Sequence, residues 1–416
     1  MAVEDPIRGA ELADRFRDRQ SGLIERSQRL RSDLPLRYLR QQAHLTAPAS
    51  DARLAEKALG GAHAVAGRLL GRYSIDASQV AARLEVPAET VAAVLETGGA
   101  PVVLLDLEDG VAPGSEAAAR ATAAALLRDV DRGSSLCFLR PAGVEDPRCV
   151  DDLVEVLLAA GAGRAGGAYP LDGIVLPKVR HPEEIDWLDE LLISIERSLG
   201  LPAATIRVSL QIETAWGVLN LRELAVRARA RLAGLILGTV DLSADLLLPE
   251  VRYRHPSCEW ARRILVAVAG ALGVPAIDGM TLDFPVPQPG GTPEENRERV
   301  LERMRTNFDD CRHSIDAGMS GRWTGHPLQL VATELAFRSV YGPERIDALL
   351  SEVDTFAAAT GAGRGASTSS QGELLDMATD RHVRLLLRRA VAWGYLPTER
   401  AAALGLISPG EVEPAT

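Results

Sequence analysis

Cysteine is scarce in this chain, which has four cysteines among 416 residues. They are Cys137, Cys149, Cys258 and Cys311, and none belongs to a C-x-x-C pair. Disulfide frameworks and structural zinc sites need closely spaced cysteines, so we expect neither here. Cys137 lies inside an apolar run and is predicted to fill space in the core.

Long apolar runs and an excess of positive charge are also missing. No stretch reaches the roughly 18 apolar residues that span a bilayer. Residues 1–6 are acidic and lack the apolar segment of a signal peptide. We therefore expect a cytoplasmic protein that does not enter a membrane. The formal net charge of −11 argues against binding to nucleic acid, which requires a basic surface.

Common catalytic signatures are absent too. The chain has no Walker A sequence, no G-x-S-x-G turn and no H-E-x-x-H helix, so the enzyme classes that these mark have no support. The seven histidines are scattered. Only His326, which follows an expected strand, is a candidate site residue, and a structural role is the slightly better interpretation.

A regular alternation of short apolar runs with helical sequence fills most of the chain. Such alternation indicates a parallel sheet, and eight units predict a closed TIM (β/α)8 barrel. The expected strands are residues 43–48, 102–107, 136–139, 173–176, 206–212, 235–237, 274–277 and 318–324.

Additional helical sequence flanks and interrupts the expected barrel. Residues 1–40 are predicted to form a helical N-terminal extension, and residues 41–340 the barrel. A helical insertion is expected at about 60–97, before the second strand, and residues 341–416 are expected to form a C-terminal helical segment or lid. Residues 78–95 resemble a helix-turn-helix, but they lack a basic recognition face, which favours the insertion.

Charged residues follow nearly every expected strand. They are Glu108, Asp109, Arg140, Lys178, Glu213, Asp241 and Asp278. Active sites of barrel enzymes lie at the C-terminal ends of the strands, so this pattern predicts an enzyme. Glu213 and Asp241 end neighbouring runs and would offer two oxygen ligands to Mg²⁺. The alternative is that each carboxylate caps the helix that follows it.

Seven segments, in order, resemble motifs of the HpcH/HpaI aldolase and citrate lyase β-subunit superfamily, which includes malyl-CoA lyases. The resemblance covers roughly residues 100–395. The segments are LDLEDGV (105–111), GIVLPKV (173–179), IETAWGVLN (212–220), GTVDLSAD (238–245), VPAIDG (274–279), GHPLQ (325–329) and GELLDM (372–377).

The resemblance implies a TIM barrel with a Mg²⁺ ion, replaceable by Mn²⁺, that chelates a 2-oxo or 2-hydroxy acid. Glu213 and Asp241 would bind the metal. Arg140, Glu108 and Asp376 would be catalytic. Asp376 belongs to a C-terminal segment that in relatives often acts across a subunit boundary, so we expect a homo-oligomer, a trimer or a hexamer.

The resemblance also implies residues that bind the substrate and order the site. Asp106 and Asp109 would order the groups around the metal. The expected substrate-binding residues are Arg140, Lys178, Gly238, Thr239 and Val240, the last three through backbone N–H groups.

Three functions compete on this sequence. The leading one is a Mg²⁺-dependent carbon–carbon lyase that cleaves a 3-hydroxyacyl-CoA, such as malyl-CoA or citramalyl-CoA, into an acyl-CoA and a 2-oxo acid, or runs in reverse as a synthase. The second is a CoA-independent aldolase that releases pyruvate or another 2-oxo acid. Those aldolases typically carry a His where this chain has Asp109, which favours the lyase. The third is a non-catalytic barrel subunit, which the presence of Glu213, Asp241 and Arg140 disfavours.

Overall fold

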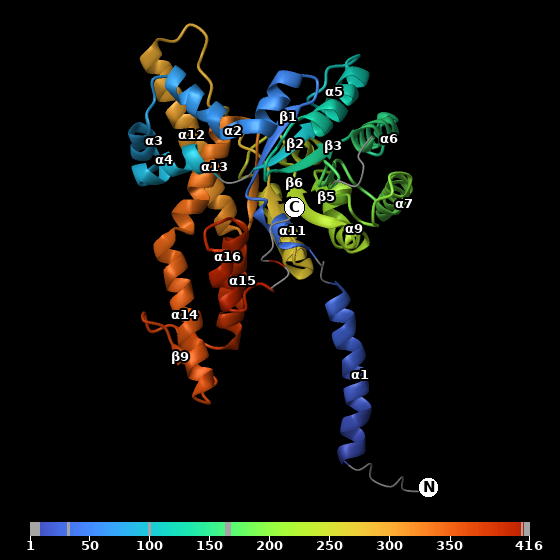
Figure 1. Cartoon of the computed structure of the whole chain (residues 1–416), viewed down its shortest axis with the longest axis vertical. Helices are drawn as coiled ribbons and strands as arrows, with labels where there is room; N and C mark the ends of the chain where they lie inside the picture. Colours follow the sequence, from blue (N-terminus) through green and yellow to red (C-terminus); the bar gives the residue numbers. More distant parts are fainter. Residues whose placement is uncertain (1–8, 31–33, 99–100, 163–167, 409–410, 412–416) are drawn as a thin grey trace.

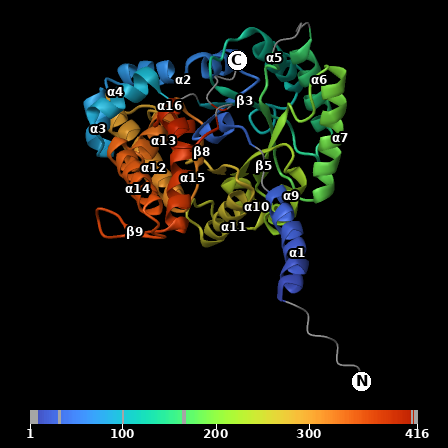
Figure 2. The same cartoon turned by 60° about the horizontal axis from the view of Figure 1, so that its bottom comes forward.

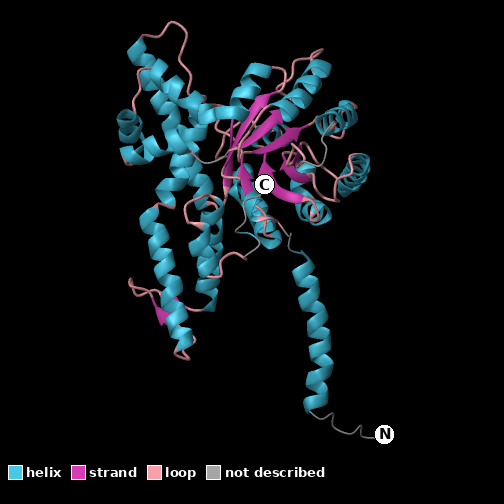
Figure 3. Cartoon of the chain, viewed as in Figure 1, coloured by secondary structure: helices cyan, strands magenta, loops and turns pink. Residues whose placement is uncertain are grey.

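A closed barrel forms the centre of the fold. The computed structural model describes residues 9–30, 34–98, 101–162, 168–408 and 411, and eight strands pair in chain order into one parallel barrel (Figure 3). The TIM barrel prediction is confirmed. The strands are β1 (Ala43–Pro48), β2 (Val102–Asp106), β3 (Leu136–Arg140), β4 (Gly173–Leu176), β5 (Arg207–Ile212), β6 (Leu232–Leu237), β7 (Ala276–Asp278) and β8 (Gly321–Thr324).

Burial on both faces explains why the strands are continuous apolar runs. Every residue of β2 and β3 is buried, including Asp106 and Arg140 at their ends. Parallel strands with helices outside and packed side chains inside favour such runs. The register sets Asp106 opposite Arg140, and Ile212 opposite Leu237. The charged residues at and after these strand ends are thereby collected at one face of the barrel.

Helices connect the strands and surround the barrel (Figure 1). The longest, α12, begins with a capping box in which Thr292 and Glu295 each accept a hydrogen bond from the other's backbone N–H. These helices are α5 (Glu116–Asp129), α6 (Arg148–Gly161), α7 (Pro182–Ser198), α8 (Ala215–Leu219), α9 (Leu221–Ala228), α10 (Thr239–Asp245), α11 (Pro256–Leu272), α12 (Pro293–Asp316) and α13 (Pro327–Val340).

Three helices lie between β1 and β2, where the helical insertion was expected. They are α2 (Ala52–Arg72), α3 (Ala77–Leu84) and α4 (Ala88–Thr97), and they pack against α12 and α13 (Figure 1). Val80 and Val91 lie in an apolar core shared with Met304. The imidazole Nε2 of His63 lies 2.9 Å from the carboxylate of Glu334 on α13. The insertion is therefore a second packed layer beside the barrel.

Two further segments extend away from the barrel (Figures 1 and 2). One is the N-terminal helix α1 (Gly9–Leu30). The other is a C-terminal arm in which α14 and α15 pack together around Leu349 and Leu387. Within the described ranges, none of the helices has the length and apolar character that a membrane crossing requires. The arm consists of α14 (Pro343–Gly361), β9 (Ser367–Thr368), β10 (Leu374–Leu375), α15 (Met377–Ala392) and α16 (Thr398–Ala403).

Candidate active site

A cavity of about 440 Å³ lies at the C-terminal ends of the strands. Seven of the eight strands, or the loops directly after them, contribute to its wall. Of the predicted site residues, those that line it are Asp106, Asp109, Arg140, Glu213, Gly238, Thr239, Val240 and Asp241. Glu108 and Lys178 do not line it but contact residues that do.

Asp106 and Arg140 form a buried, two-pronged ion pair at the ends of β2 and β3. Arg140 Nε donates to Asp106 Oδ1 at 2.7 Å, and Arg140 Nη2 donates to Oδ2 at 2.8 Å. The backbone N–H groups of Glu108 and Gly110 also donate to the Asp106 carboxylate. Burial opposes the guanidinium charge, but Asp106 and Glu108 raise the pKa of Arg140 overall. Arg140 is therefore a fixed, permanently charged group in the wall of the cavity.

Glu108 joins the two cations of the site. Its carboxylate lies 2.8 Å from Arg140 Nη1 and 2.6 Å from Lys178 Nζ. Burial raises the pKa of Glu108 to about 7, although Arg140 and Lys178 oppose the shift. Lys178 Nζ also lies 3.2 Å from Asp109 and 3.6 Å from Asp241. These acids raise the pKa of Lys178 against the effect of burial, so its ammonium group remains charged.

Glu213, at the end of β5, is 1% exposed. Its Oε1 accepts a hydrogen bond from the backbone N–H of Lys178 at 2.9 Å, and its Oε2 accepts one from the Gln211 side chain. Lys178 itself has a left-handed backbone with φ of 52°, which is uncommon for a residue with a side chain. Burial, with Glu108 and Asp241 nearby, raises the pKa of Glu213 to about 8.

The charge balance of the site fits a divalent cation. Five carboxylates (Asp106, Glu108, Asp109, Glu213 and Asp241) surround two cations (Arg140 and Lys178), which leaves an excess of negative charge. Burial is the main cause of the raised pKa of Glu213, Glu108 and Asp241 add to it, and a bound cation would favour the ionised carboxylate. Within the described ranges, no three His, Cys, Asp or Glu side chains are arranged to hold a metal alone. Glu213 and Asp241 would therefore share the ion with water and substrate oxygens.

The turn from β6 into α10 provides the cavity with backbone donors. Gly238 precedes the helix, and Thr239, Val240 and Asp241 form its first turn. The N–H groups of Thr239 and Val240 have no partner within the helix, so they are available to a substrate carboxylate. The N–H of Gly238 donates to the carbonyl oxygen of Ile212 at 3.0 Å, so it is not one of these donors, contrary to the prediction. A Cβ on Gly238 would lie 2.3 Å from Glu213 Oε2, so only glycine lets this turn approach the carboxylate.

Most of the remaining cavity wall comes from residues outside the predicted catalytic, metal-binding and substrate-binding set. Gln211 lies two residues before Glu213, and the twofold periodicity of a strand places both side chains on one face, which is the signal that reveals it. Trp323 packs over Arg140, with 5.2 Å from the guanidinium carbon to the ring centre, and its indole N–H donates to Thr46. The apolar part of the wall comes from Leu237, Val240, Met280, Leu282 and Phe284.

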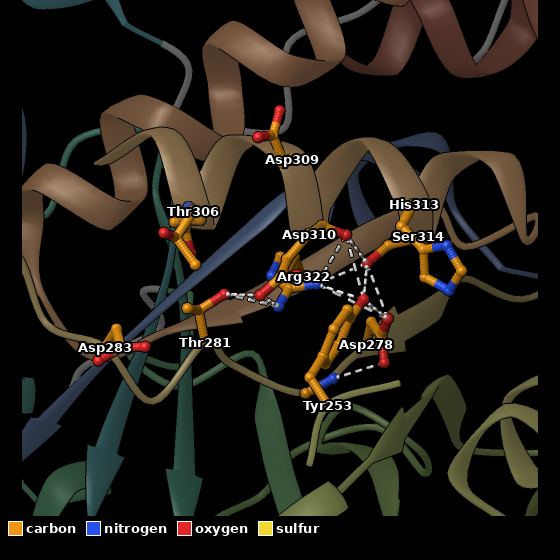
Figure 4. Close-up of polar contacts among 12 residues, drawn as sticks. Tyr253, Asp278, Thr281, Asp283, Thr306, Asp309, Asp310, His313, Ser314 and Arg322 are labelled. Atoms are coloured by element: carbon orange, nitrogen blue, oxygen red, sulfur yellow. Dashed lines mark hydrogen bonds and ion pairs between the residues drawn. The ribbon is translucent and has the colours of Figure 1, made fainter. Parts of the chain in front are cut away.

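Asp278 differs from the other charged residues at the strand ends. Its carboxylate accepts hydrogen bonds from Ser314 on α12 at 2.7 Å and from Tyr253 at 2.6 Å (Figure 4). It also accepts one from Arg262 on α11 at 2.8 Å. Burial alone would raise the pKa of Asp278, but Arg262 and Arg322 lower it overall. Asp278 thus belongs to a network between barrel and helices, outside the cavity, and its prediction as a charge at the active face is wrong.

Two other candidates lie outside the cavity. His326 precedes α13, and its Nδ1 accepts a hydrogen bond from the backbone N–H of Leu328, which agrees with a structural role. Asp376 caps α15 on the C-terminal arm, where its carboxylate accepts from the N–H groups of Ala378 and Thr379. These bonds lower the pKa of Asp376. Within one chain, therefore, the predicted catalytic acid is not part of the cavity.

Comparison with known proteins agrees with the fold and the motifs. The chain belongs to the family described as "Domain of unknown function (DUF6986)", whose model matches residues 37–411. It is 28% identical over 308 residues to an L-malyl-CoA/beta-methylmalyl-CoA lyase of Cereibacter sphaeroides, covering 70% of this chain and 87% of the relative. It is 31% identical over 183 residues to the citrate lyase subunit beta of Leuconostoc mesenteroides subsp. cremoris, covering 43% of this chain and 56% of the relative.

Solved structures share the fold. A citrate lyase from Burkholderia xenovorans LB400 aligns with a TM-score of 0.58 at 23% identity, covering 76% of this chain and 91% of that one. A malate synthase of Haloferax volcanii, solved with pyruvate and acetyl-CoA, aligns with a TM-score of 0.52 at 17% identity, covering 91% of this chain and 97% of that one. The predicted place in the HpcH/HpaI and citrate lyase β superfamily is confirmed.

Proposed function

We propose that the protein is a carbon–carbon lyase that depends on Mg²⁺ or Mn²⁺. It cleaves a 3-hydroxyacyl-CoA, such as malyl-CoA or citramalyl-CoA, into an acyl-CoA and a 2-oxo acid, or joins them in reverse. The observation that carries this proposal is the cluster of Glu213, Asp241 and Arg140 in one cavity at the strand ends. The lyase names of the relatives support it.

The reaction needs positive charge beside two oxygen atoms. A carboxylate of the cavity wall would accept the 3-hydroxyl proton, the bond between C2 and C3 would break, C3 would become the carbonyl carbon of the 2-oxo acid, and the electron pair of the broken bond would move onto the thioester as an enolate. A divalent cation at Glu213 and Asp241 would hold the 2-oxo acid oxygens and stabilise their negative charge. A proton then adds to C2 of the enolate and gives the acyl-CoA.

Other residues of the chain would bind the substrate and stabilise the charge that develops on it. Arg140, held by Asp106, presents its guanidinium to the cavity and would stabilise developing oxygen charge without reorganising. The first turn of α10 would bind the substrate carboxylate through its N–H groups. Glu108 and Lys178 do not line the cavity but would support the residues that do. Glu108 pairs with both Arg140 and Lys178, and the backbone N–H of Lys178 donates to Glu213.

The proton at C2 requires a separate acid. Asp376, on the arm, is assigned this role in a neighbouring copy of the chain within a trimer or hexamer. Its carboxylate at the start of α15 is held ionised, so once a second copy encloses it, it would take the C2 proton in the condensation direction and return that proton in cleavage.

A substrate screen tests the proposal. The protein is incubated with Mg²⁺ and a panel of 2-oxo acids, with and without acyl-CoAs, and new carbon–carbon bonds are detected by mass. We expect products only when both partners are present. Products formed from 2-oxo acids without CoA would instead identify the CoA-independent aldolase. No product in any arm would contradict both enzymes.

A further inference from the structure

A second cavity, of about 600 Å³, lies at the opposite end of the barrel. Its lining comes from segments that precede strands: the 3-10 helix η1 (Leu36–Arg40) before β1, and the loops before β3, β4 and β5. The candidate active site lies at the strands' other ends. This cavity is therefore a separate site, and a ligand bound in it is independent of the proposed lyase function.

One buried carboxylate organises the cationic side chains of this cavity. Asp172 is 3% exposed, and its two oxygens pair with the guanidinium groups of Arg37 and Arg132. The backbone N–H of Cys137 also donates to it at 2.8 Å. The acceptor capacity of Asp172 is thus largely used by these partners.

The third guanidinium group of the cavity, that of Arg40, has no carboxylate partner among the described residues. Arg40 donates to the backbone oxygen of Ser134, and within the described ranges it forms no ion pair with a carboxylate. Burial, together with Arg37 and Arg132, lowers the pKa of Arg40 to about 10. Asp131, next in the chain to Arg132, instead accepts from the backbone N–H of Gly133 and does not line the cavity.

The cluster therefore has more positive charge than its own carboxylate neutralises. Among the described residues that line the cavity there are three guanidinium groups and one carboxylate, a formal excess of two positive charges in a chain whose net charge is −11. The buried Nε atoms of Arg37 and Arg40 lack a hydrogen-bond partner in the described structure. A purely structural ion network normally balances its charges and satisfies its donors. The hydroxyl groups of Ser134 and Ser135 add further donors along the lining, whereas the hydroxyl of Thr205 donates to the carbonyl oxygen of Pro202.

We infer that this cavity is a binding site for a small molecule that carries a phosphate group. A phosphate dianion matches the excess charge, and its oxygens suit the planar forks of several arginines. The cavity is larger than a bare ion and falls within the range of metabolite sites, roughly 300–1,000 Å³. Two buried tyrosines, Tyr38 and Tyr169, provide apolar surface for the organic part of a phosphate ester. The phosphate can come from free inorganic phosphate or from such an ester.

Calorimetric titration of the full-length protein tests this site. Three probes are used at constant ionic strength: inorganic phosphate, glucose 6-phosphate and adenosine 3′,5′-bisphosphate. We expect at least one probe to bind with a 1:1 stoichiometry and to raise the melting temperature above that in matched sodium chloride. Tighter binding of either ester than of inorganic phosphate would identify an organic phosphate as the ligand, and the reverse would identify the free ion.

Variants assign the binding to the cavity. Arg40→Gln is expected to lower the affinity for the probe that binds by about tenfold or more. Arg40→Lys, which keeps the charge, is expected to lower this affinity less. Arg53→Gln removes one positive charge from an exposed position on α2 and is expected to have no effect. If Arg40→Gln does not fold, Ser134→Ala serves with the same expectation of weaker binding. Absence of binding by all probes to the wild-type protein, or equal affinity in the cavity variants, would overturn the inference.

Discussion

Asp106 and Arg140 bind each other through two parallel hydrogen bonds, of 2.7 and 2.8 Å, at matching positions in the register of β2 and β3. This pair fixes the plane of the guanidinium in the wall of the cavity. The pair also explains why Asp106, itself at the cavity, has no free role there: its oxygens accept from Arg140 and from the turn that carries Glu108 and Gly110. We therefore expect Asp106 to position Arg140, and Arg140 to act on the substrate.

Replacing Asp106 should therefore impair turnover through Arg140. Asp106→Asn keeps the shape but weakens the ion pair, and we expect kcat to fall by about 100-fold, the order of losing one preorganised donor. Steady-state kinetics checks this, with circular dichroism to confirm folding. Asp146→Asn is the matched control, because Asp146 binds Arg148 in a similar two-pronged pair that is partly exposed. Equal kinetics in the two variants would contradict the positioning role.

Gly238 should tolerate no side chain. The Cβ of Gly238→Ala would lie 2.3 Å from Glu213 Oε2 and 2.6 Å from Glu213 Cβ, so the carboxylate must move. We expect Mg²⁺ affinity, measured by the metal dependence of turnover, to fall about tenfold or more. Gly270→Ala, in the last turn of α11 with no atom within 4 Å of the new Cβ, should leave this affinity unchanged. If the metal dependence of turnover is unaltered in Gly238→Ala, the assignment of Glu213 as a metal ligand is contradicted.

His44 should make stability depend on pH. It is fully buried in β1, and within the described residues neither ring nitrogen has a partner. Burial lowers the pKa of His44 to about 3, so below about pH 6.5 the unfolded chain takes up a proton that the folded chain refuses. Stability should then fall by about 1.4 kcal/mol per pH unit between pH 6.5 and 3, and His44→Leu should lack this component.

Urea unfolding at pH 7.5 and 5.5 measures that difference. The loss of unfolding free energy on acidification should be about 1.4 kcal/mol smaller in His44→Leu than in the wild type. Replacing the exposed His382 by Gln is the control and should retain the wild-type dependence. Identical pH dependence in His44→Leu and the wild type would contradict the assignment of a neutral, buried imidazole.

Asp376 should act on a neighbouring copy. Asp376→Asn keeps a good helix cap, so the arm should remain folded while enolate proton exchange, followed by deuterium incorporation, is lost. Mixing Asp376→Asn with Glu213→Gln, each inactive alone, should restore up to about a quarter of the activity in mixed oligomers. No recovery after subunit exchange would place the acid elsewhere.

The sequence predicts the barrel well because its signals are local. Eight apolar runs separated by helical sequence determine strand number and direction, and the charge after each run indicates the active face. The side on which a strand-end residue projects is not local, because neighbouring residues of a strand point to opposite faces. Asp278 and Glu213 are therefore indistinguishable in sequence, although Asp278 faces Arg262 and Ser314 outside the barrel.

Contacts between residues far apart in the chain also limit what the sequence can predict. Trp323 lies over Arg140 because β8 closes on β1, a contact between residues far apart in the chain. The position of Asp376 depends on how α14 and α15 pack around their own core, which no motif describes. The Arg37, Arg40 and Arg132 cluster likewise forms only when η1 reaches the loops before β3 and β4.

The most direct measurement compares the wild type with Glu213→Gln and Asp241→Asn on the thioester substrate that the screen identifies. Each protein is treated with EDTA and then supplied with increasing Mg²⁺, and release of the 2-oxo acid is followed by mass. We predict that the wild type is inactive after EDTA and recovers with Mg²⁺, whereas both folded variants stay inactive at every concentration. Undiminished turnover in either variant, or full activity of the wild type without metal, would contradict the assignment of Glu213 and Asp241 as the metal ligands of a lyase.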